Sequence, residues 1–279
     1  MFLVKDENDL CFSKGKILLF DREIILHKSY KFNHMILIGI NKKATIKFNN
    51  GNFLLKNNNY LFNLKIKNAD SNGIKICGSN NIIKNITVSN CKNTGIQITK
   101  NSSNNKIFNC FSYENNSGQN KADGFGCKFE SGKNNIFKNC IAYNNEDDGF
   151  DLFEAKYGVK LINCFAYKNG TKNSTASGFK LGGFSSLNKI FYPKHFLKNC
   201  IAYNNQNYGF TANNQTGTII MKKCSGYLNK KENFFFPKFS HPKALNKKEL
   251  INGKFYLYKC YSHNQPINIT GVINENTGL

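Results

Sequence analysis

An eight-residue pattern that begins with Asn-Cys recurs along this chain and limits the possible folds more than any other feature. The four clearest copies are "NCFSYENN" (109–116), "NCIAYNNE" (139–146), "NCFAYKNG" (163–170) and "NCIAYNNQ" (199–206). Each is followed by a turn, a glycine and an apolar–x–apolar segment, such as "GFDL" from Gly149 and "GFKL" from Gly178. Fixed strands separated by segments of variable length are typical of a solenoid, in which insertions lie in loops.

The repeat also indicates which kind of solenoid to expect. No segment keeps the i, i+3, i+4, i+7 pattern of an amphipathic helix, which argues against leucine-rich and ankyrin repeats. Each unit instead holds two or three short β-type segments separated by Asn, Gly and Ser turns. We therefore predict an all-β fold, a parallel β-helix (solenoid) whose successive coils lie about 4.8 Å apart. Recurrent Asn would stack into a ladder of amide hydrogen bonds. An Asn-rich chain that never folds conflicts with the 14% aromatic content.

The ten cysteines follow the same repeat. Six of them fall at one point of the pattern, with Cys260 as a possible seventh: Cys91, Cys110, Cys140, Cys164, Cys200 and Cys224. None forms a CxxC pair, so a zinc site is not indicated. A small buried apolar residue used once per coil explains these positions better than a set of disulfides.

We expect a single domain over residues 1–279. Residues 1–60 keep strand-like alternation but lack the NCxxY pattern, and they are predicted to form an N-terminal cap or the first coils. Residues 61–230 are predicted to form the regular coils. Residues 231–279 are predicted to form less regular C-terminal coils or a tail.

The chain is strongly basic, with 39 Lys and Arg against 17 Asp and Glu and a formal net charge of +22. This charge favours an anionic partner: an acidic polysaccharide, nucleic acid or a membrane surface. The basic residues are scattered and no aromatic–basic motif stands out, which argues against nucleic acid. No apolar run is long enough for a transmembrane helix, and "MFLVKDENDLCF" carries charges where a signal peptide needs its apolar core. We expect a monomer with neither a membrane nor a nucleic-acid partner.

Against this basic background, "NNEDDGFDLF" (144–153) places four carboxylates within six residues. In each strand the residue after the glycine is predicted to point inward and the next one outward. The outward positions of successive coils are Lys75, Gln97, Gly126, Asp151, Lys180 and Thr211. The positions before the glycine form a second column, which contains Asn72, Thr94, Asp123, Asp148, Ser177 and Tyr208. Asp123 should therefore lie one coil from Asp148, with Asp147 beside both, and Asp151 one coil from Lys180.

Two interpretations of this cluster differ in the role of the charges. As ordinary turn residues, the aspartates and Lys180 would each be solvated. Like charges stacked on adjacent rungs are destabilising unless a cation neutralises them, and oxygen ligands on a rigid strand face suit Ca²⁺. Beside a cation the pKa of a lysine falls readily, which would make Lys180 a usable general base.

Three segments of the chain resemble the motifs of the family 9 polysaccharide lyases, which include calcium-dependent pectate lyases. They are "KADGFGCK" (121–128), "NNEDDGFDLF" (144–153) and "SGFKLGG" (177–183), in the family's order, and the resemblance runs from about residue 15 to residue 227. It implies a right-handed parallel β-helix with an asparagine ladder. It also implies a Ca²⁺ site formed by Asp123, Asp147, Asp148 and Asp151, with Lys180 as the catalytic base. Glu146 has no role in the motif, and we expect it to be solvated.

The resemblance implies anti β-elimination on an acidic polysaccharide. Uronate carboxylates would bind Ca²⁺, which acidifies the C5 proton, and neutral Lys180 would remove it. Lys128, two residues beyond Gly126, is predicted to point outward; it would hold a substrate carboxylate or be an exposed charge without a role. A pectin substrate implies an extracellular protein, although no secretion signal is readable.

Other functions on the same scaffold stay open at this point. The family also includes rhamnogalacturonan lyases, and the sequence does not choose between that substrate and polygalacturonate. An inverting polygalacturonase would need Gly-His-Gly and Arg-x-Lys motifs, and the five His and single Arg provide neither. A non-catalytic glycan-binding repeat protein would need no special relation between Lys180 and the aspartates.

Overall fold

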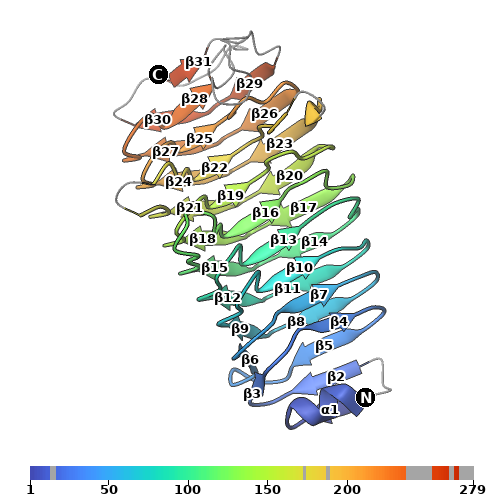
Figure 1. Ribbon diagram of the computed structural model, residues 1–279. Helices are drawn as coiled ribbons and strands as arrows, with labels where there is room; N and C mark the ends of the chain where they lie inside the picture. Colours follow the sequence, from blue (N-terminus) through green and yellow to red (C-terminus); the bar gives the residue numbers. More distant parts are fainter. Residues whose placement is uncertain (13–16, 172–173, 187–188, 237–252, 264–266, 270–279) are drawn as a thin grey trace.

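The strands of this protein wind around one long axis (Figure 1). The computed structural model describes residues 1–12, 17–171, 174–186, 189–236, 253–263 and 267–269. In this part of the chain the strands form three sheets, and consecutive strands along most of the chain fall in different sheets. Neighbouring strands within a sheet pair in parallel, each with its equivalent one coil away. The predicted all-β parallel solenoid is confirmed.

Each sheet takes one strand from nearly every coil, so its strands follow one another in space along the axis. The first sheet contains β1 (Phe2–Val4), β2 (Ile17–Phe20), β5 (Ile36–Gly39), β8 (Tyr60–Phe62), β11 (Ile82–Lys84), β14 (Lys106–Phe108), β17 (Asn135–Lys138), β20 (Val159–Ile162), β23 (Lys194–Lys198), β26 (Thr218–Lys222) and β29 (Lys254–Tyr258). The second contains β4 (Tyr30–Phe32), β7 (Phe53–Leu55), β10 (Ile74–Ile76), β13 (Ile96–Ile98), β16 (Phe125–Cys127), β19 (Phe150–Asp151), β22 (Phe179–Lys180), β25 (Phe210–Thr211), β28 (Phe234–Phe236) and β31 (Ile267–Ile269). The third contains β3 (Glu23–Leu26), β6 (Thr45–Phe48), β9 (Lys65–Lys67), β12 (Thr87–Ser89), β15 (Phe111–Tyr113), β18 (Ile141–Tyr143), β21 (Phe165–Tyr167), β24 (Ile201–Tyr203), β27 (Ser225–Tyr227) and β30 (Tyr261–His263).

A short helix, α1 (Glu7–Phe12), lies at the N-terminal end of the coil beside β1 and β3 (Figure 1). None of the helices in the described residues is long and apolar enough to span a bilayer. Within the C-terminal part that we expected to be less regular, β29, β30 and β31 continue the three sheets. Residues 237–252, 264–266 and 270–279 of that part lie outside the described residues.

The interior is filled by columns of identical or similar side chains. The first residues of five strands in the second sheet stack with ring centroids 4.7 to 4.9 Å apart: Phe125, Phe150, Phe179, Phe210 and Phe234. The cysteines of the repeat form another buried column, and the nine whose side chains are described are all free thiols. Their predicted role as small buried apolar residues is confirmed.

Asparagine ladders occur at more than one position, which explains why the chain has 47 Asn. In the buried ladder Asn115, Asn145, Asn169 and Asn205 each donate an amide hydrogen bond of 2.8 to 3.0 Å to the Asn of the next coil, and the series reaches Asn229. A second buried ladder runs from Asn59 to Asn135. The Asn of each Asn-Cys pair lies instead at the surface with a positive φ, 53° for Asn109 and 54° for Asn139, a conformation that Asn tolerates better than most residues.

Candidate functional site

The second sheet carries the predicted site on its outer face. Its register pairs Gly126 with Asp151 and Asp151 with Lys180. On either side the column continues to Gln97 and Lys75, and to Thr211. The outward column predicted from the sequence is therefore confirmed over β10 to β25.

The second predicted column is held together by hydrogen bonds between coils. Thr94 Oγ1 donates to Asp123 Oδ2 (2.9 Å), and the Asp148 N–H donates to Asp123 Oδ1 (3.2 Å). Asp148 Oδ1 accepts from the Ser177 N–H (2.6 Å). Each carboxylate is thus fixed by its neighbour in an adjacent coil, as the predicted order of the column requires.

Glycine follows each of these two aspartates because the coils approach closely there. A Cβ at Gly149 would lie 2.6 Å from the Gly178 carbonyl oxygen and 2.8 Å from the Ala166 Cβ. Such contacts are too short for any side chain, so the Asp-Gly pairs reflect tight packing between the turn and the next coil. The aspartates at these positions are consequently held on rigid backbone.

Three of the four predicted ligands come together in one buried group. Asp123, Asp148 and Asp151 are 0 to 1% exposed, and each offers a carboxylate oxygen within 4.8 Å of the others. Asp147 is half-buried and lies outside this group, lining the adjoining groove. We call the three buried residues the aspartate cluster.

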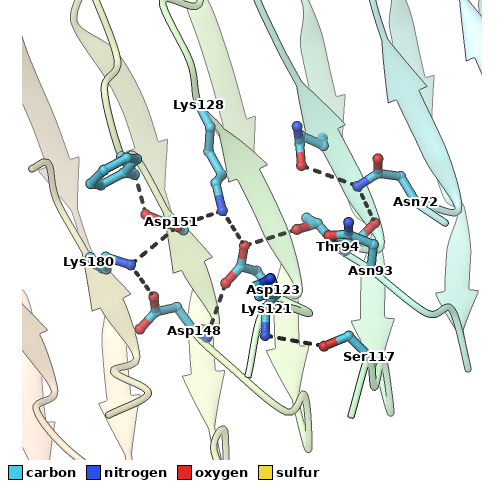
Figure 2. A network of polar contacts seen from close by, with 12 residues as sticks. Asn72, Asn93, Thr94, Ser117, Lys121, Asp123, Lys128, Asp148, Asp151 and Lys180 are labelled. Carbon is cyan, nitrogen blue, oxygen red and sulfur yellow. Dashed lines mark hydrogen bonds and ion pairs between the residues drawn. The ribbon is translucent and has the colours of Figure 1, made fainter. Parts of the chain in front are cut away.

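Two lysines point into the aspartate cluster (Figure 2). Lys180 Nζ lies 3.1 Å from Asp148 Oδ2 and 3.4 Å from Asp151 Oδ2, as its predicted position beside Asp151 implies. Lys128 Nζ lies 2.9 Å from Asp123 Oδ2 and 2.8 Å from Asp151 Oδ2, and its side chain is only 12% exposed. The interpretation of Lys128 as an exposed charge is wrong, because its flexible chain folds back onto the buried carboxylates.

The electrostatics of the site show a shortage of positive charge. Burial and the neighbouring aspartates raise the pKa of Asp147 to about 9, and burial together with Asp151 and Asp123 raises that of Asp148 to about 7 although Lys180 opposes the shift. Burial also acts to raise the pKa of Asp151, but Lys128 and Lys180 outweigh it and hold that pKa below its usual value. Four carboxylates against two ammonium groups leave a formal charge of −2. The donor set therefore fits a divalent cation, with the hard oxygen ligands that Ca²⁺ takes.

The same shifts predict how stability depends on pH and calcium. Because the folded-state pKa values of Asp147 and Asp148 lie above the usual aspartate value of 3.8, their favourable contribution is complete at low pH. It is lost as the pH rises through about 7 and about 9. Without metal, the melting temperature should fall as the pH rises from the usual aspartate pKa of 3.8 to about 9. Millimolar Ca²⁺ should raise the melting temperature, and more so at higher pH.

Thermal unfolding at several pH values, with Ca²⁺ or with chelator, measures both effects. The variant Asp147→Asn is the matched control, since it removes the carboxylate with the higher of the two pKa values. The metal-free melting temperature of this variant should vary less with pH than that of the wild type. A wild-type protein whose metal-free stability increases over this range would contradict the prediction.

Glu146, expected to be solvated, is buried instead. It is 5% exposed and accepts hydrogen bonds from the Ser117 N–H (2.9 Å), the Ser117 hydroxyl and the Lys121 N–H (3.4 Å). Burial acts to raise its pKa, but these hydrogen bonds outweigh burial and lower it. The prediction failed because the loop before Ala122 folds over Glu146, a contact that the repeat pattern does not encode.

A groove adjoins the aspartate cluster on the outer face of the second sheet. It has a volume of about 450 Å³ and is lined by Ser71, Asn72, Lys75, Asn93, Gln97, Thr99, Lys121, Lys128, Phe129, Asp147, Asp151, Phe153 and Lys180. Lys180 Nζ lies 5.6 Å from the Phe153 ring centroid, and Lys128 Nζ lies 5.3 Å from that of Phe129. Another hollow, of about 470 Å³ near Gly39 and Asn63, has no carboxylate in its lining, so the chemistry points to the groove.

Several residues of this groove had no role predicted from the sequence. Lys75 and Gln97 appeared in the outward column, but nothing in the repeat indicated that the column borders a hollow. Lys121 lies in the "KADGFGCK" motif, where its position two residues before Asp123 was a usable signal. Nothing in the sequence indicated that Phe129 and Phe153 line a groove, apart from their places near Lys128 and Asp151.

The sequence of this chain matches the family described as "Pel9A-like, right handed beta helix region" over residues 11–246. The chain belongs to this family. The predicted membership and the right-handed coil are thereby confirmed. The coiled fold explains why the repeat places the candidate site residues on one outer sheet face.

Curated relatives and solved structures agree with this family. The chain is 39% identical over 153 residues to "Pectate lyase L" of Paenibacillus polymyxa (strain SC2). The aligned region covers 50% of this chain and 33% of that protein. The chain is 38% identical over 151 residues to "Pectate lyase L" of Thermoclostridium stercorarium, over 50% of this chain and 12% of that one. The aligned part therefore covers a third or less of these two relatives.

Among solved structures, pectate lyase Pel9A superimposes with a TM-score of 0.79 at 22% identity, over 97% of this chain and 72% of that one. A structure titled "Rhamnogalacturonan lyase" superimposes with a TM-score of 0.62 at 22% identity, over 94% and 72%. At these identities the two superpositions establish the shared fold of the coil.

Proposed function

We propose that this chain is a calcium-dependent polysaccharide lyase that cleaves polygalacturonate by anti β-elimination. The observation that carries the proposal is the position of Lys180, whose Nζ contacts two carboxylates of the buried aspartate cluster and borders the groove. A solvated turn would not bury three aspartates around two lysines. The relatives named pectate lyase support the reaction class.

The aspartate cluster and Asp147 would hold Ca²⁺, which supplies neutralisation of these carboxylates and polarisation of a substrate carboxylate. Burial acts to lower the pKa of Lys180, but Asp148 and Asp151 outweigh it and raise that pKa. Once the charge of the aspartates is neutralised, burial favours the neutral amine, which is the form that can accept a proton. The same aspartates thus keep Lys180 protonated without metal and would let it act as a base with metal.

Lys180 would remove the proton at C5 of the uronate bound in the groove. The electron pair of the C5–H bond forms a double bond between C4 and C5, and the bond between C4 and the glycosidic oxygen breaks. The proton moves to Lys180 Nζ, and the departing oxygen takes a proton from solvent. The products are a shortened chain and an unsaturated uronate, and no water is consumed at the sugar.

The ultraviolet absorbance of the unsaturated product tests this proposal. The protein is incubated with polygalacturonate and with rhamnogalacturonan, with Ca²⁺ or with chelator. Absorbance should rise on polygalacturonate with Ca²⁺ and stay flat with chelator, whereas hydrolysis would give no such chromophore. A rise on rhamnogalacturonan alone would reassign the substrate, and no rise on either polymer would reject the lyase reaction in favour of a glycan-binding protein.

The substrate also indicates where the protein acts. Pectic polymers lie outside the cells that degrade them, so we propose an extracellular site of action for this chain. The partner is then an acidic polysaccharide, which suits the formal net charge of +22.

A further inference from the structure

The groove extends from the aspartate cluster toward the N-terminal coils. The register runs from Asp151 through Gly126 and Gln97 to Lys75, three rungs away. At about 4.8 Å per rung this is about 14 Å, which is longer than one sugar ring. Asn72 and Asn93 lie on the same side of the cluster (Figure 2). The reacting sugar therefore accounts for only one end of the groove.

The lysines that line the groove fall into two classes. Lys128 and Lys180 are already paired with the aspartate cluster. Lys75 and Lys121 have no carboxylate within ion-pair distance among the described residues. Lys121 Nζ contacts only the Gln119 amide oxygen (3.1 Å), and Lys75 is half-buried on the outer face of β10. These two ammonium groups are available to an anion that enters the groove.

The buried Glu146 helps to position Lys121 at the groove. The loop that precedes Ala122 is fixed by the hydrogen bonds from Ser117 and from the Lys121 N–H to the Glu146 carboxylate. Glu146 directly precedes Asp147, which lines the groove as well. One buried carboxylate thus ties the position of Lys121 to the coil that holds the candidate metal ligands.

Gln97 adds a neutral donor between Lys75 and the aspartate cluster. Its Oε1 accepts a hydrogen bond from Asn72 Nδ2 (3.2 Å), and Asn72 Nδ2 also donates to the Thr94 carbonyl (3.2 Å). Because Asn72 takes the oxygen of Gln97, the Gln97 NH₂ group is left as the donor of that side chain. A carboxylate accepts hydrogen bonds from both ammonium and amide donors.

We propose that Lys75, Gln97 and Lys121 form a carboxylate-binding subsite that begins beside the aspartate cluster at Lys121 and extends to its N-terminal side at Gln97 and Lys75. It binds acidic sugar residues that neighbour the reacting one, so that the polymer runs along the axis of the coil toward β10. The inference rests on the proposed function for the class of substrate, and it is independent of whether the bound chain is cleaved.

Isothermal titration with hexagalacturonate, with Ca²⁺ or with chelator, tests the subsite. The double variant Lys75→Ala/Lys121→Ala should bind at least about tenfold more weakly than the wild type. The matched control is Lys84→Ala/Lys138→Ala, which removes two exposed lysines of the first sheet, outside the groove. The control should stay within about twofold of the wild type, since exposed charges far from the ligand are screened. The double variant Lys75→Arg/Lys121→Arg should retain binding.

The outcomes separate this inference from the lyase proposal. Equal losses in the groove and control variants would mean that net charge alone attracts the ligand and would overturn the subsite, as would unchanged binding by Lys75→Ala/Lys121→Ala. Absence of hexagalacturonate binding by the wild type would overturn it as well. Selective loss of binding without any unsaturated product would reject the lyase proposal and leave the subsite standing. Where product forms, the groove variant should raise KM with kcat retained.

Discussion

Replacing Lys180 by alanine is expected to lower kcat on polygalacturonate by about 10³-fold, within the range for loss of a general acid or base. The side chain contacts Asp148 and Asp151 and lines the groove. A sugar bound in the groove would therefore lie next to the Lys180 amine. The variant Lys180→Arg keeps the positive charge. Its guanidinium cannot lose a proton, so its kcat should fall by a similar factor.

Lys128 provides the matched control for this prediction, because it is the other lysine paired with the aspartate cluster. Lys128→Ala also removes one positive charge from the aspartate cluster, where Lys128 contacts Asp123 and shares Asp151 with Lys180. Its effect should appear in KM and in the calcium dependence more than in kcat. Initial rates with melting temperatures for all three variants make the measurement. Near wild-type kcat in Lys180→Arg, or the larger kcat loss in Lys128→Ala, would remove Lys180 from the role of base.

The sequence predicted the columns of this site because the coil constrains them. Tight packing at Gly149 and the alternation of inward and outward residues put Asp151 beside Lys180, and Asp148 beside Asp123. In a parallel coil each rung repeats the geometry of the one before, so aligning the copies of the repeat aligns the side chains in space. Residues attached to the regular rungs could therefore be placed without coordinates.

The features that the sequence missed lie where the repeat is interrupted or where a side chain is long. The burial of Glu146 depends on how the inserted loop through Ser117 folds, and insertions are not part of the repeat. The inward turn of Lys128 depends on rotamers that a strand pattern leaves open. Asp147 lies outside the buried group although it adjoins Asp148 in sequence, because successive side chains point in different directions.

Replacing Asp151 by asparagine is expected to weaken Ca²⁺ binding by about 100-fold or more, since even the loss of an outer-shell partner costs 10- to 100-fold in metal sites. Asp151 is the buried carboxylate shared by Lys128 and Lys180, and the lysines hold its pKa low, so it carries its charge throughout the neutral range. Asn preserves the shape and the oxygen that accepts from the Phe153 N–H (2.9 Å) but removes that charge.

Calcium titration by calorimetry, and activity as a function of Ca²⁺, measure this loss in Asp151→Asn. The control Glu114→Gln removes an exposed carboxylate outside the groove and should leave both curves unchanged. Activity of Asp151→Asn should reappear in part at high Ca²⁺, because Lys180 and the other aspartates remain. If calcium binding were unchanged while activity was lost, Asp151 would act by orienting Lys180 rather than as a metal ligand. The calcium titration therefore decides whether Asp151, which contacts both lysines, acts as a metal ligand or by orienting Lys180.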